Sequence, residues 1–277
     1  DKAFYQHLQN ARTALSKIER NKIFIDEEYL LNYVSDCEEK NKHMATAILN
    51  NLDHKGYVQP SFNLMGTVTG RLTCSGNINF HSLPNKQGLK KAIKSRFDDG
   101  FILVADWNAM EFRTAMAIAQ QTMLSKTDIH TEAAKLIFQK EIITEEEREQ
   151  AKIVNFATIY GSTQRDHMEV IQELYPKLFK VISKITQDAE QQRKTINLFG
   201  RRRIFKKDTN FRTRGFNNYI QGIAADLCLR SLYLLQEKFE EYNLESKIIL
   251  TVHDSIVLDC TQKETKVIGK LIREVMT

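Results

Sequence analysis

The stretch from Thr144 to Gly161, TEEEREQAKIVNFATIYG, limits most strongly what the rest of this chain can be. Thr144 and Glu147 have the spacing of a capping box, in which each residue satisfies a backbone N–H of the other at the start of a helix. Most of the residues that follow are strong helix formers. The stretch therefore predicts an α-helix with a well-defined beginning.

Along this predicted helix, every fourth residue carries either a cation or an aromatic ring: Arg148, Lys152, Phe156 and Tyr160. Four residues advance only about 40° past a full turn, so these side chains form one stripe on one face. Two cations followed by two rings suit a ligand that is polyanionic at one end and flat at the other, such as a nucleoside triphosphate. The same spacing also fits a surface helix with a basic first half and a buried aromatic second half.

Composition excludes several classes of protein. The chain has 277 residues, 42% of them hydrophobic and 27% charged, which is typical of a globular protein with one large or two closely packed domains. No apolar run is long enough to cross a membrane, and the first residues lack the apolar core of a secretory signal. The four cysteines are scattered, which favours reduced thiols over a zinc site or a disulfide frame. The net charge of +5 is compatible with nucleic acid but is weak evidence.

Two aspartates have unusual positions relative to apolar runs: Asp106 directly follows one, and Asp254 lies between two others. The run from Phe101 to Ala105 predicts a buried strand that ends in Asp106, where a carboxylate can either present a metal ligand or cap the next helix. From Lys247 to Leu258, two apolar strands flank His253 and Asp254, which predicts a β-hairpin with a polar tip.

If the two carboxylates meet in space, they could hold two divalent cations that activate a hydroxyl and stabilise a leaving pyrophosphate. Hard oxygen ligands without clustered Cys or His favour Mg²⁺ over zinc. Weaker local signals are Arg71 beside the flexible Gly70, a basic run that includes Lys86, and the cluster from Gly200 to Arg203, which predicts a hairpin turn.

Four motifs occur along the chain in a fixed order: TVTGRL at 67–72, DWNAMEFR at 106–113, REQAKIVNFATIYG at 148–161 and VHDS at 252–255. Supporting matches are DIH at 128–130, GRRR at 200–203 and NNYIQGIAADL at 217–227. With these motifs the chain resembles the polymerase domain of family A DNA polymerases, the bacterial DNA polymerase I type, from about residue 18 to the C-terminus. Each motif alone is a weak signal, whereas the ordered set is specific.

The resemblance implies an α+β, right-hand polymerase fold with an antiparallel palm sheet, helical fingers and a shortened helical thumb. It places N-terminal helices and a reduced thumb at 1–66, the first part of the palm at 67–125, the fingers at 126–199 and the second part of the palm at 200–277. A short thumb leads us to expect weak grip on DNA and low processivity. With no exonuclease segment before residue 1, we expect no proofreading by this chain.

The implied activity is template-directed DNA synthesis, in which dNTPs are added to a primer 3′-OH by two-metal-ion phosphoryl transfer with release of pyrophosphate. The implied cofactor is a pair of Mg²⁺ ions, with Mn²⁺ as a substitute. The implied partners are primer–template DNA and dNTPs, together with a processivity or exonuclease partner of unknown identity. No membrane is expected to be involved. The expected location is intracellular: the cytoplasm of a bacterium or of a phage-infected cell, with an organelle as the alternative.

The resemblance also implies a role for each candidate site residue. Asp106 and Asp254 become the catalytic, metal-binding carboxylates, and the main-chain carbonyl of Trp107 helps to hold the second ion. The implied nucleotide-binding residues are Glu111, His130, Arg148, Lys152, Phe156 and Tyr160. The implied DNA-binding residues are Arg71, Asn217, Gln221 and His253.

The resemblance implies that the roles within these sets differ, as follows. Arg148, Lys152 and His130 contact the triphosphate. Phe156 packs beside the deoxyribose, where it discriminates against sugars that lack a 3′-OH, and Tyr160 stacks near the template base. Glu111 occupies the space that a ribose 2′-OH would need, which favours deoxynucleotides. Among the DNA contacts, the implied role of Arg71 and Gln221 is to contact the minor-groove edge of the primer-terminal base pair. The implied role of His253 is to contact the primer end.

The sequence departs from the family pattern at three places. Ser255 stands where a third carboxylate is usual, but the two-metal reaction needs only the two aspartates, so we expect activity to survive. Trp107, Asn108 and Ala109 replace the common Tyr-Ser-Gln, and Thr213 stands where an arginine is usual.

Two other functions compete with DNA synthesis. A single-subunit RNA polymerase shares the Lys…Tyr-Gly helix, but Glu111 and Phe156 favour deoxynucleotides. A catalytically inactive protein that binds primer–template is the second alternative, and the retention of both carboxylates and both triphosphate cations argues against it.

Overall fold

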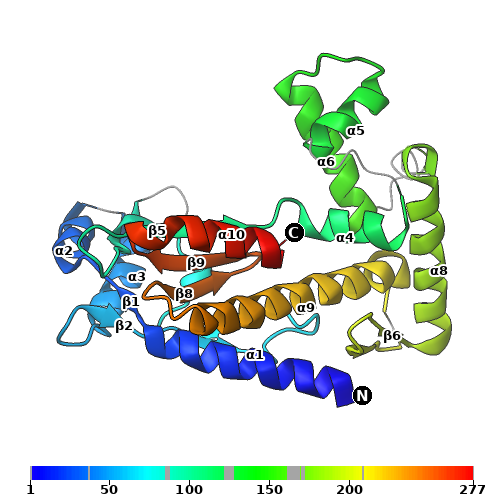
Figure 1. The fold of residues 1–277 in the computed structure, drawn as a ribbon. Helices are drawn as coiled ribbons and strands as arrows, with labels where there is room; N and C mark the ends of the chain where they lie inside the picture. The colour runs from blue at the N-terminus through cyan, green and yellow to red at the C-terminus, as the bar shows by residue number, and fades with distance from the viewer. Residues whose placement is uncertain are drawn as a thin grey trace. The chain divides into compact units, whose positions relative to one another are not determined.

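The computed structural model describes residues 2–36, 38–84, 88–121, 128–160, 169, 172–207 and 209–276, without the side chains at 39, 40 and 212 (Figure 1). The chain divides into two compact units. One contains residues 108–226, and the other contains residues 2–107 together with 227–277. None of the described helices combines the length and the apolar character that a membrane crossing requires.

A three-stranded antiparallel sheet is the centre of the unit formed by residues 2–107 and 227–277. Its order is β5 (Phe101–Asp106), β9 (Ser255–Cys260) and β8 (Lys247–Val252), so β9 is the middle strand. Strands β8 and β9 pair in a hairpin, and β5 pairs with β9 from Phe101↔Cys260 to Asp106↔Ser255. The predicted hairpin is therefore confirmed.

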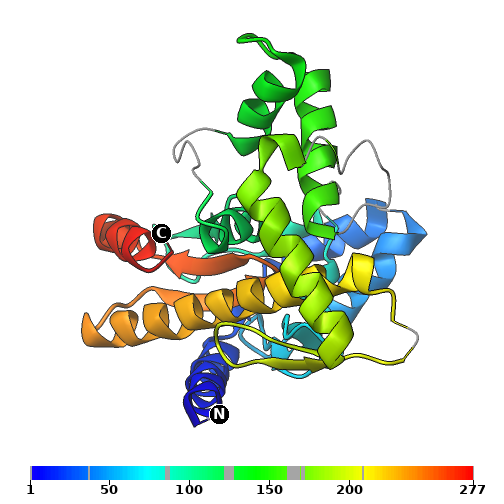
Figure 2. The ribbon, with the colours of Figure 1, turned by 90° about the vertical axis from the view of Figure 1, so that its right-hand side faces the viewer.

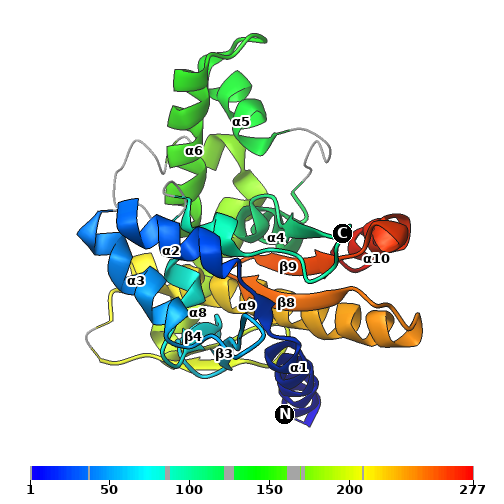
Figure 3. The ribbon, with the colours of Figure 1, turned by 90° about the vertical axis from the view of Figure 1, so that its left-hand side faces the viewer.

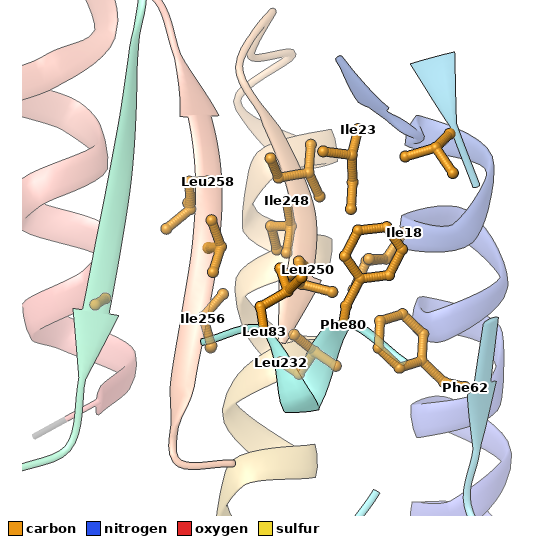
Figure 4. Packing of buried hydrophobic residues seen from close by; sticks show 14 of the residues in the cluster. Ile18, Ile23, Phe62, Phe80, Leu83, Leu232, Ile248, Leu250, Ile256 and Leu258 are labelled. Atoms are coloured by element: carbon orange, nitrogen blue, oxygen red, sulfur yellow. The ribbon is translucent and has the colours of Figure 1, made fainter. Parts of the chain in front are cut away.

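Helices pack against this sheet and close the core of the unit. They are α1 (Lys2–Asn21), the part of α9 (Phe211–Glu241) that belongs to this unit, and α10 (Thr265–Met276). Figure 4 shows Ile248 and Leu250 of β8 directed toward Leu232 of α9 and Ile18 of α1. Ile18 and Ile248 are fully buried, and each such side chain stabilises the fold by about 1.5–3 kcal/mol.

Shorter elements complete this unit (Figure 3). Helix α2 (Glu27–Asp36) begins after Asp26, whose side chain accepts a hydrogen bond from the backbone N–H of Tyr29 at 2.9 Å, as an N-cap does. The remaining elements are α3 (Glu39–Leu49), the strand pair β1 (Ile23–Phe24) and β2 (Tyr57–Val58), the pair β3 (Ser61–Asn63) and β4 (Thr73–Ser75), and the 3₁₀ turns η1 (Phe80–Ser82), η2 (Leu89–Ala92) and η3 (Gln262–Glu264).

The unit formed by residues 108–226 is mainly helical. It contains α4 (Met110–Ile118), α5 (Ile129–Phe138), α6 (Glu145–Tyr160), α8 (Pro176–Gln192), the first part of α9, and a hairpin of β6 (Lys194–Ile196) and β7 (Arg202–Ile204). Helices α5 and α6 pack on one another through Ala133, Ala134 and Ala151, which are at most 1% exposed. Small side chains at the contact allow two helices to approach closely.

The α+β class and the antiparallel sheet are confirmed, whereas one local expectation was wrong. Strand β5 is not a buried strand: Val104 is 60% exposed and only Ala105 of the run is buried, because β5 lies at the edge of the sheet. The hairpin predicted at the basic cluster is present: Gly200 and Arg201 lie in its turn at 197–201, and Arg202 and Arg203 begin β7. The division into thumb, palm and fingers remains a prediction.

Candidate functional site

The two candidate metal-binding carboxylates lie at the same end of the three-stranded sheet. Asp106 is the last residue of β5, and Asp254 lies in the two-residue turn between β8 and β9. The backbone N–H of Trp107 donates to the carbonyl of Asp254 at 3.2 Å, which ties the two segments together directly beside the carboxylates. Strand pairing thus brings together two residues that are 148 positions apart in the sequence, as predicted.

Asp106 and Asp254 influence one another electrostatically. Burial raises the pKa of Asp106, and the negative charge of Asp254 raises it further. Two like charges held at one sheet end disfavour each other unless a cation lies between them. This donor set fits Mg²⁺, because Mg²⁺ is usually bound by one or two carboxylates and otherwise by water and phosphate oxygens. Among the residues that the structure describes, no group of three or more His, Cys, Asp or Glu is arranged to hold a metal ion.

His253 shares the turn with Asp254, and a second histidine that sequence reasoning missed lies beside it. The ring centroids of His81 and His253 are 5.6 Å apart, and His81 Nε2 lies 2.9 Å from the carbonyl of Thr251 in β8. His253 has a φ of 52°, a left-handed conformation that few non-glycine residues adopt. His81 thus contacts both the strand and the turn that present Asp254. No sequence motif marks it, because its partners are 170 and 172 residues away.

Ser255, which replaces the usual third carboxylate, has a structural role in this turn. Its hydroxyl donates to the carbonyl of Val252 at 2.8 Å and so closes the hairpin. In the strand register it lies opposite Asp106. A carboxylate at this position would therefore add negative charge at the end of the sheet that already carries Asp106 and Asp254.

Arg71 belongs to a tight turn in the same unit. Gly70 has a φ of 85°, which glycine adopts without strain, and the hydroxyl of Thr67 donates to the carbonyl of Arg71 at 2.9 Å. The Arg71 side chain is half-buried. The TVTGRL motif therefore specifies a defined turn, and the contact of Arg71 with DNA remains a prediction.

Helix α6, in the unit of residues 108–226, begins as the sequence predicts. The backbone N–H of Glu147 donates to the Thr144 hydroxyl at 3.3 Å, and the backbone N–H of Thr144 donates to the Glu147 carboxylate at 3.0 Å. This is the reciprocal pairing of a capping box. The helix continues to Tyr160, and Gly161 lies outside the described residues, as does Lys86 of the basic run.

The cationic half of the stripe is held in a network of carboxylates. Arg148 Nε donates to Asp128 at 2.7 Å, and its Nη1 lies 3.2 Å from both Glu145 and Glu149. Lys152 Nζ contacts both carboxylate oxygens of Glu149, at 3.0 and 3.1 Å. Glu149 thus bridges the two cations that were predicted to bind a triphosphate.

Asp128 both orients Arg148 and caps α5. Its carboxylate accepts hydrogen bonds from the backbone N–H and the hydroxyl of Thr131, at 3.1 and 2.8 Å. Burial alone would raise its pKa, but the hydrogen bonds from Arg148 and Thr131 outweigh burial and lower the pKa to about 2. Asp128 is therefore ionised at neutral pH, and the start of α5 is coupled to the cationic half of α6.

The aromatic half of the stripe is partly exposed. Phe156 and Tyr160 are 44% and 38% exposed, and their rings stack with centroids 6.0 Å apart at an angle of 21°. The His130 ring lies 5.9 Å from that of Phe156. The alternative of a buried aromatic half is thus wrong, and one face of α6 presents cations followed by two accessible rings.

His130 is oriented by a buried network that sequence reasoning missed. Asn155, which is 1% exposed, donates through Nδ2 to His130 Nδ1 at 3.1 Å and accepts from the Tyr175 hydroxyl at 3.1 Å. Because Nδ1 accepts, the proton of the neutral ring is on Nε2. Burial lowers the pKa of His130, so at neutral pH it offers an uncharged N–H donor and not a cation.

The remaining predicted residues of this unit lie on α4 and α9. Glu111 is in the first turn of α4 and is 7% exposed. Asn217 and Gln221 are half-buried and four residues apart on α9, which places them on one face of that helix. The structure thus brings His130 together with the stripe of α6. For Glu111, Asn217 and Gln221, the predicted roles remain predictions.

Comparison with known proteins identifies both the fold and the family of this chain. The fold is that of a DNA polymerase I polymerase domain: the "POL domain of Pol1 from M. smegmatis complex with DNA primer-template and dNTP" aligns with a TM-score of 0.84 and 18% identity, over 97% of this chain and 66% of that one. The family model of DNA polymerase family A matches residues 2–277, and the chain belongs to this family.

Two curated DNA polymerases to which the chain is similar are much longer than the chain itself. The chain is 31% identical over 253 residues to DNA polymerase I of Caldicellulosiruptor bescii, covering 80% of this chain and 30% of that protein. It is 29% identical over 270 residues to the DNA polymerase of Bacillus phage SP01, covering 81% of this chain and 29% of that one. The chain therefore spans about a third of the length of these relatives.

Proposed function

We propose that this chain is a DNA-directed DNA polymerase that adds deoxynucleotides to the 3′-OH of a primer paired with a template. The observation that supports this most strongly is the face of α6, where Arg148 and Lys152 precede the accessible rings of Phe156 and Tyr160. Membership of DNA polymerase family A supports the same conclusion, and the M. smegmatis structure with a similar fold contains primer–template DNA and a dNTP.

In this proposal, Asp106 and Asp254 hold divalent ions, with the Trp107 carbonyl as a further ligand. Two Mg²⁺ ions, or Mn²⁺ in their place, would supply activation of the primer hydroxyl and neutralisation of charge on the phosphates. The shared sheet end and the mutual repulsion of the two carboxylates support this assignment.

The α6 residues bind and orient the incoming nucleotide. Arg148 and Lys152 supply charge-assisted contacts to its phosphates, and His130 Nε2–H donates to the same group without adding charge. Phe156 packs against the sugar and Tyr160 stacks near the template base. Because phosphoryl transfer depends mainly on positioning and electrostatic stabilisation, these contacts supply most of what the protein must provide beyond the metal ions.

The other predicted residues determine what is bound and copied. Glu111 excludes a ribose 2′-OH and so favours dNTPs over rNTPs. Asn217 and Gln221 of α9 contact the DNA, as do Arg71 and His253 of the other unit. Activity with Ser255 in place of a third carboxylate is part of the proposal, because its hydroxyl already closes the hairpin that presents Asp254.

Extension of a primed DNA template tests the proposal directly. Purified chain with Mg²⁺ and dNTPs should lengthen the primer, and rNTPs should be incorporated far less efficiently. Product length should be recorded along with yield, because the predicted reduced thumb leads us to expect short products in each binding event. Efficient extension with rNTPs would favour an RNA polymerase, and binding of primer–template without any extension would leave only a binding protein.

A further inference from the structure

The hairpin of β6 and β7 belongs to the most basic segment of the chain and has no role in the proposed function. Residues 191–207 contain no Asp or Glu, and their Lys and Arg residues are Arg193, Lys194, Arg201, Arg202, Arg203, Lys206 and Lys207. Figure 2 shows the hairpin as an extended ribbon beside α8, which contacts β6. A run of cations is often only a solvated surface, so its geometry decides whether it can bind anything.

The strand register sorts the side chains of the hairpin onto two faces. Thr195 pairs with Arg203, while Lys194 pairs with Ile204 and Ile196 pairs with Arg202. Directly paired residues point to the same side of a sheet, and so do residues two apart. Lys194, Ile196, Arg202 and Ile204 therefore share one face, which we call the outer face.

The inner face holds the hairpin in place. Thr195 and Phe205 are 9% and 6% exposed. At the turn, Arg201 Nη2 donates to the fully buried Asp226 of α9 at 2.7 Å, and Asn197 Nδ2 donates to the same carboxylate at 2.8 Å. Breaking a buried, hydrogen-bonded ion pair of this kind is costly, so the ribbon is firmly attached to α9.

The outer face, in contrast, combines exposed aliphatic and cationic side chains. Ile196 and Ile204 are 54% and 60% exposed, and Leu198 at the turn is 69% exposed. Arg202 is exposed and Lys194 half-buried, and neither forms an ion pair within the described part of the chain. In the register each isoleucine lies opposite a cation, so charge and apolar surface alternate across the face.

We propose that this outer face binds single-stranded DNA, namely the unpaired template. The cations complement phosphates, while the isoleucines can cover the flat faces of bases. In a duplex those base faces are stacked inside, so only a single strand offers phosphates and base faces to one surface. The proposal rests on the proposed function, because it identifies the bound strand as template.

Binding to a labelled single-stranded oligonucleotide, and to the same sequence as a duplex, tests this. The variant Lys194→Gln/Arg202→Gln should bind the single strand more weakly, with the slope of log K against log salt smaller by about 1.4, because each contact with a single-strand phosphate contributes about 0.7. The variant Ile196→Thr/Ile204→Thr should weaken binding about tenfold without changing the slope. Threonine keeps the preference for strand, so the hairpin is retained.

A matched control changes the same kinds of residue elsewhere in the unit. Ile142 is 87% exposed and Lys184 is exposed on α8, so Ile142→Thr/Lys184→Gln should leave single-strand binding unchanged. The inference would be overturned if both hairpin variants bound the single strand as the native chain does, or if they lost as much affinity for the duplex. If the native chain bound the single strand and the hairpin variants did not, but primers were never extended, the proposed polymerase activity would fail and the binding surface would stand.

Discussion

Glu149 competes with the nucleotide for the cations of α6, and replacing it with glutamine should strengthen nucleotide binding. Its carboxylate contacts Lys152 at 3.0 and 3.1 Å and Arg148 at 3.2 Å, and a triphosphate must displace it from both. Glu149 is 48% exposed, so each ion pair contributes only about 0.5 kcal/mol. The loss of both pairs should lower the KM for dNTP by about fivefold, which corresponds to about 1 kcal/mol.

The assay is steady-state primer extension at varied dNTP concentration, with direct titration of a dNTP as a second measurement. Glu146→Gln is the matched control, because it removes one charge from the first turn of the same helix, and in the part of the chain that the structure describes Glu146 contacts neither cation. Both substitutions change the net charge equally, so only Glu149→Gln should show the fivefold effect. An unchanged or higher KM for Glu149→Gln would refute the assignment of Arg148 and Lys152 as triphosphate ligands.

Three further predictions concern single residues. Asp128→Asn keeps the cap of α5 but removes the charge opposite Arg148, and should lower the free energy of unfolding by about 1 kcal/mol, since the carboxylate is a third exposed and solvent screens the pair. Because the folded-state pKa of Asp128 is lowered from 3.8 to about 2, the difference in unfolding free energy between the native chain and the variant should persist above pH 4 and shrink as the pH falls toward 2. Denaturant unfolding measured across this pH range tests the prediction. A difference that does not change with pH would contradict the pairing of Asp128 with Arg148. Phe156→Tyr should raise the ratio of ddNTP to dNTP incorporation, and an unchanged ratio would mean that α6 is placed wrongly against the sugar. Ser255→Glu should change the rate of extension by less than about tenfold, whereas a gain of orders of magnitude would show that the native site is crippled.

Local patterns in the sequence predicted those parts of the structure that depend on near neighbours. The capping box of Thr144 and Glu147 and the hairpin around His253 each involve residues a few positions apart, and both are present. The pairing of Asp106 with the Asp254 turn joins distant segments, and the resemblance to a known family supplied it where periodicity alone left it open.

Contacts between distant segments without a family signature could not be predicted in this way. Asn155 looks like an ordinary polar residue of a helix, and only the fold brings His130 and Tyr175 to it. The edge position of β5 has the same origin, because an apolar run does not reveal whether a strand has neighbours on one side or two. Glu149 also escaped notice, since a glutamate in the first turns of a helix is usually explained by the helix dipole.

The most direct test of the central claim is the effect of Asp254→Asn on primer extension, measured together with binding of primer–template. The substitution keeps the size of the side chain in the β8–β9 turn and removes its charge. The account predicts that extension falls by about a thousandfold or more while DNA binding remains close to that of the native chain. Extension at a native rate by this variant would contradict the assignment of Asp106 and Asp254 as the metal-binding pair.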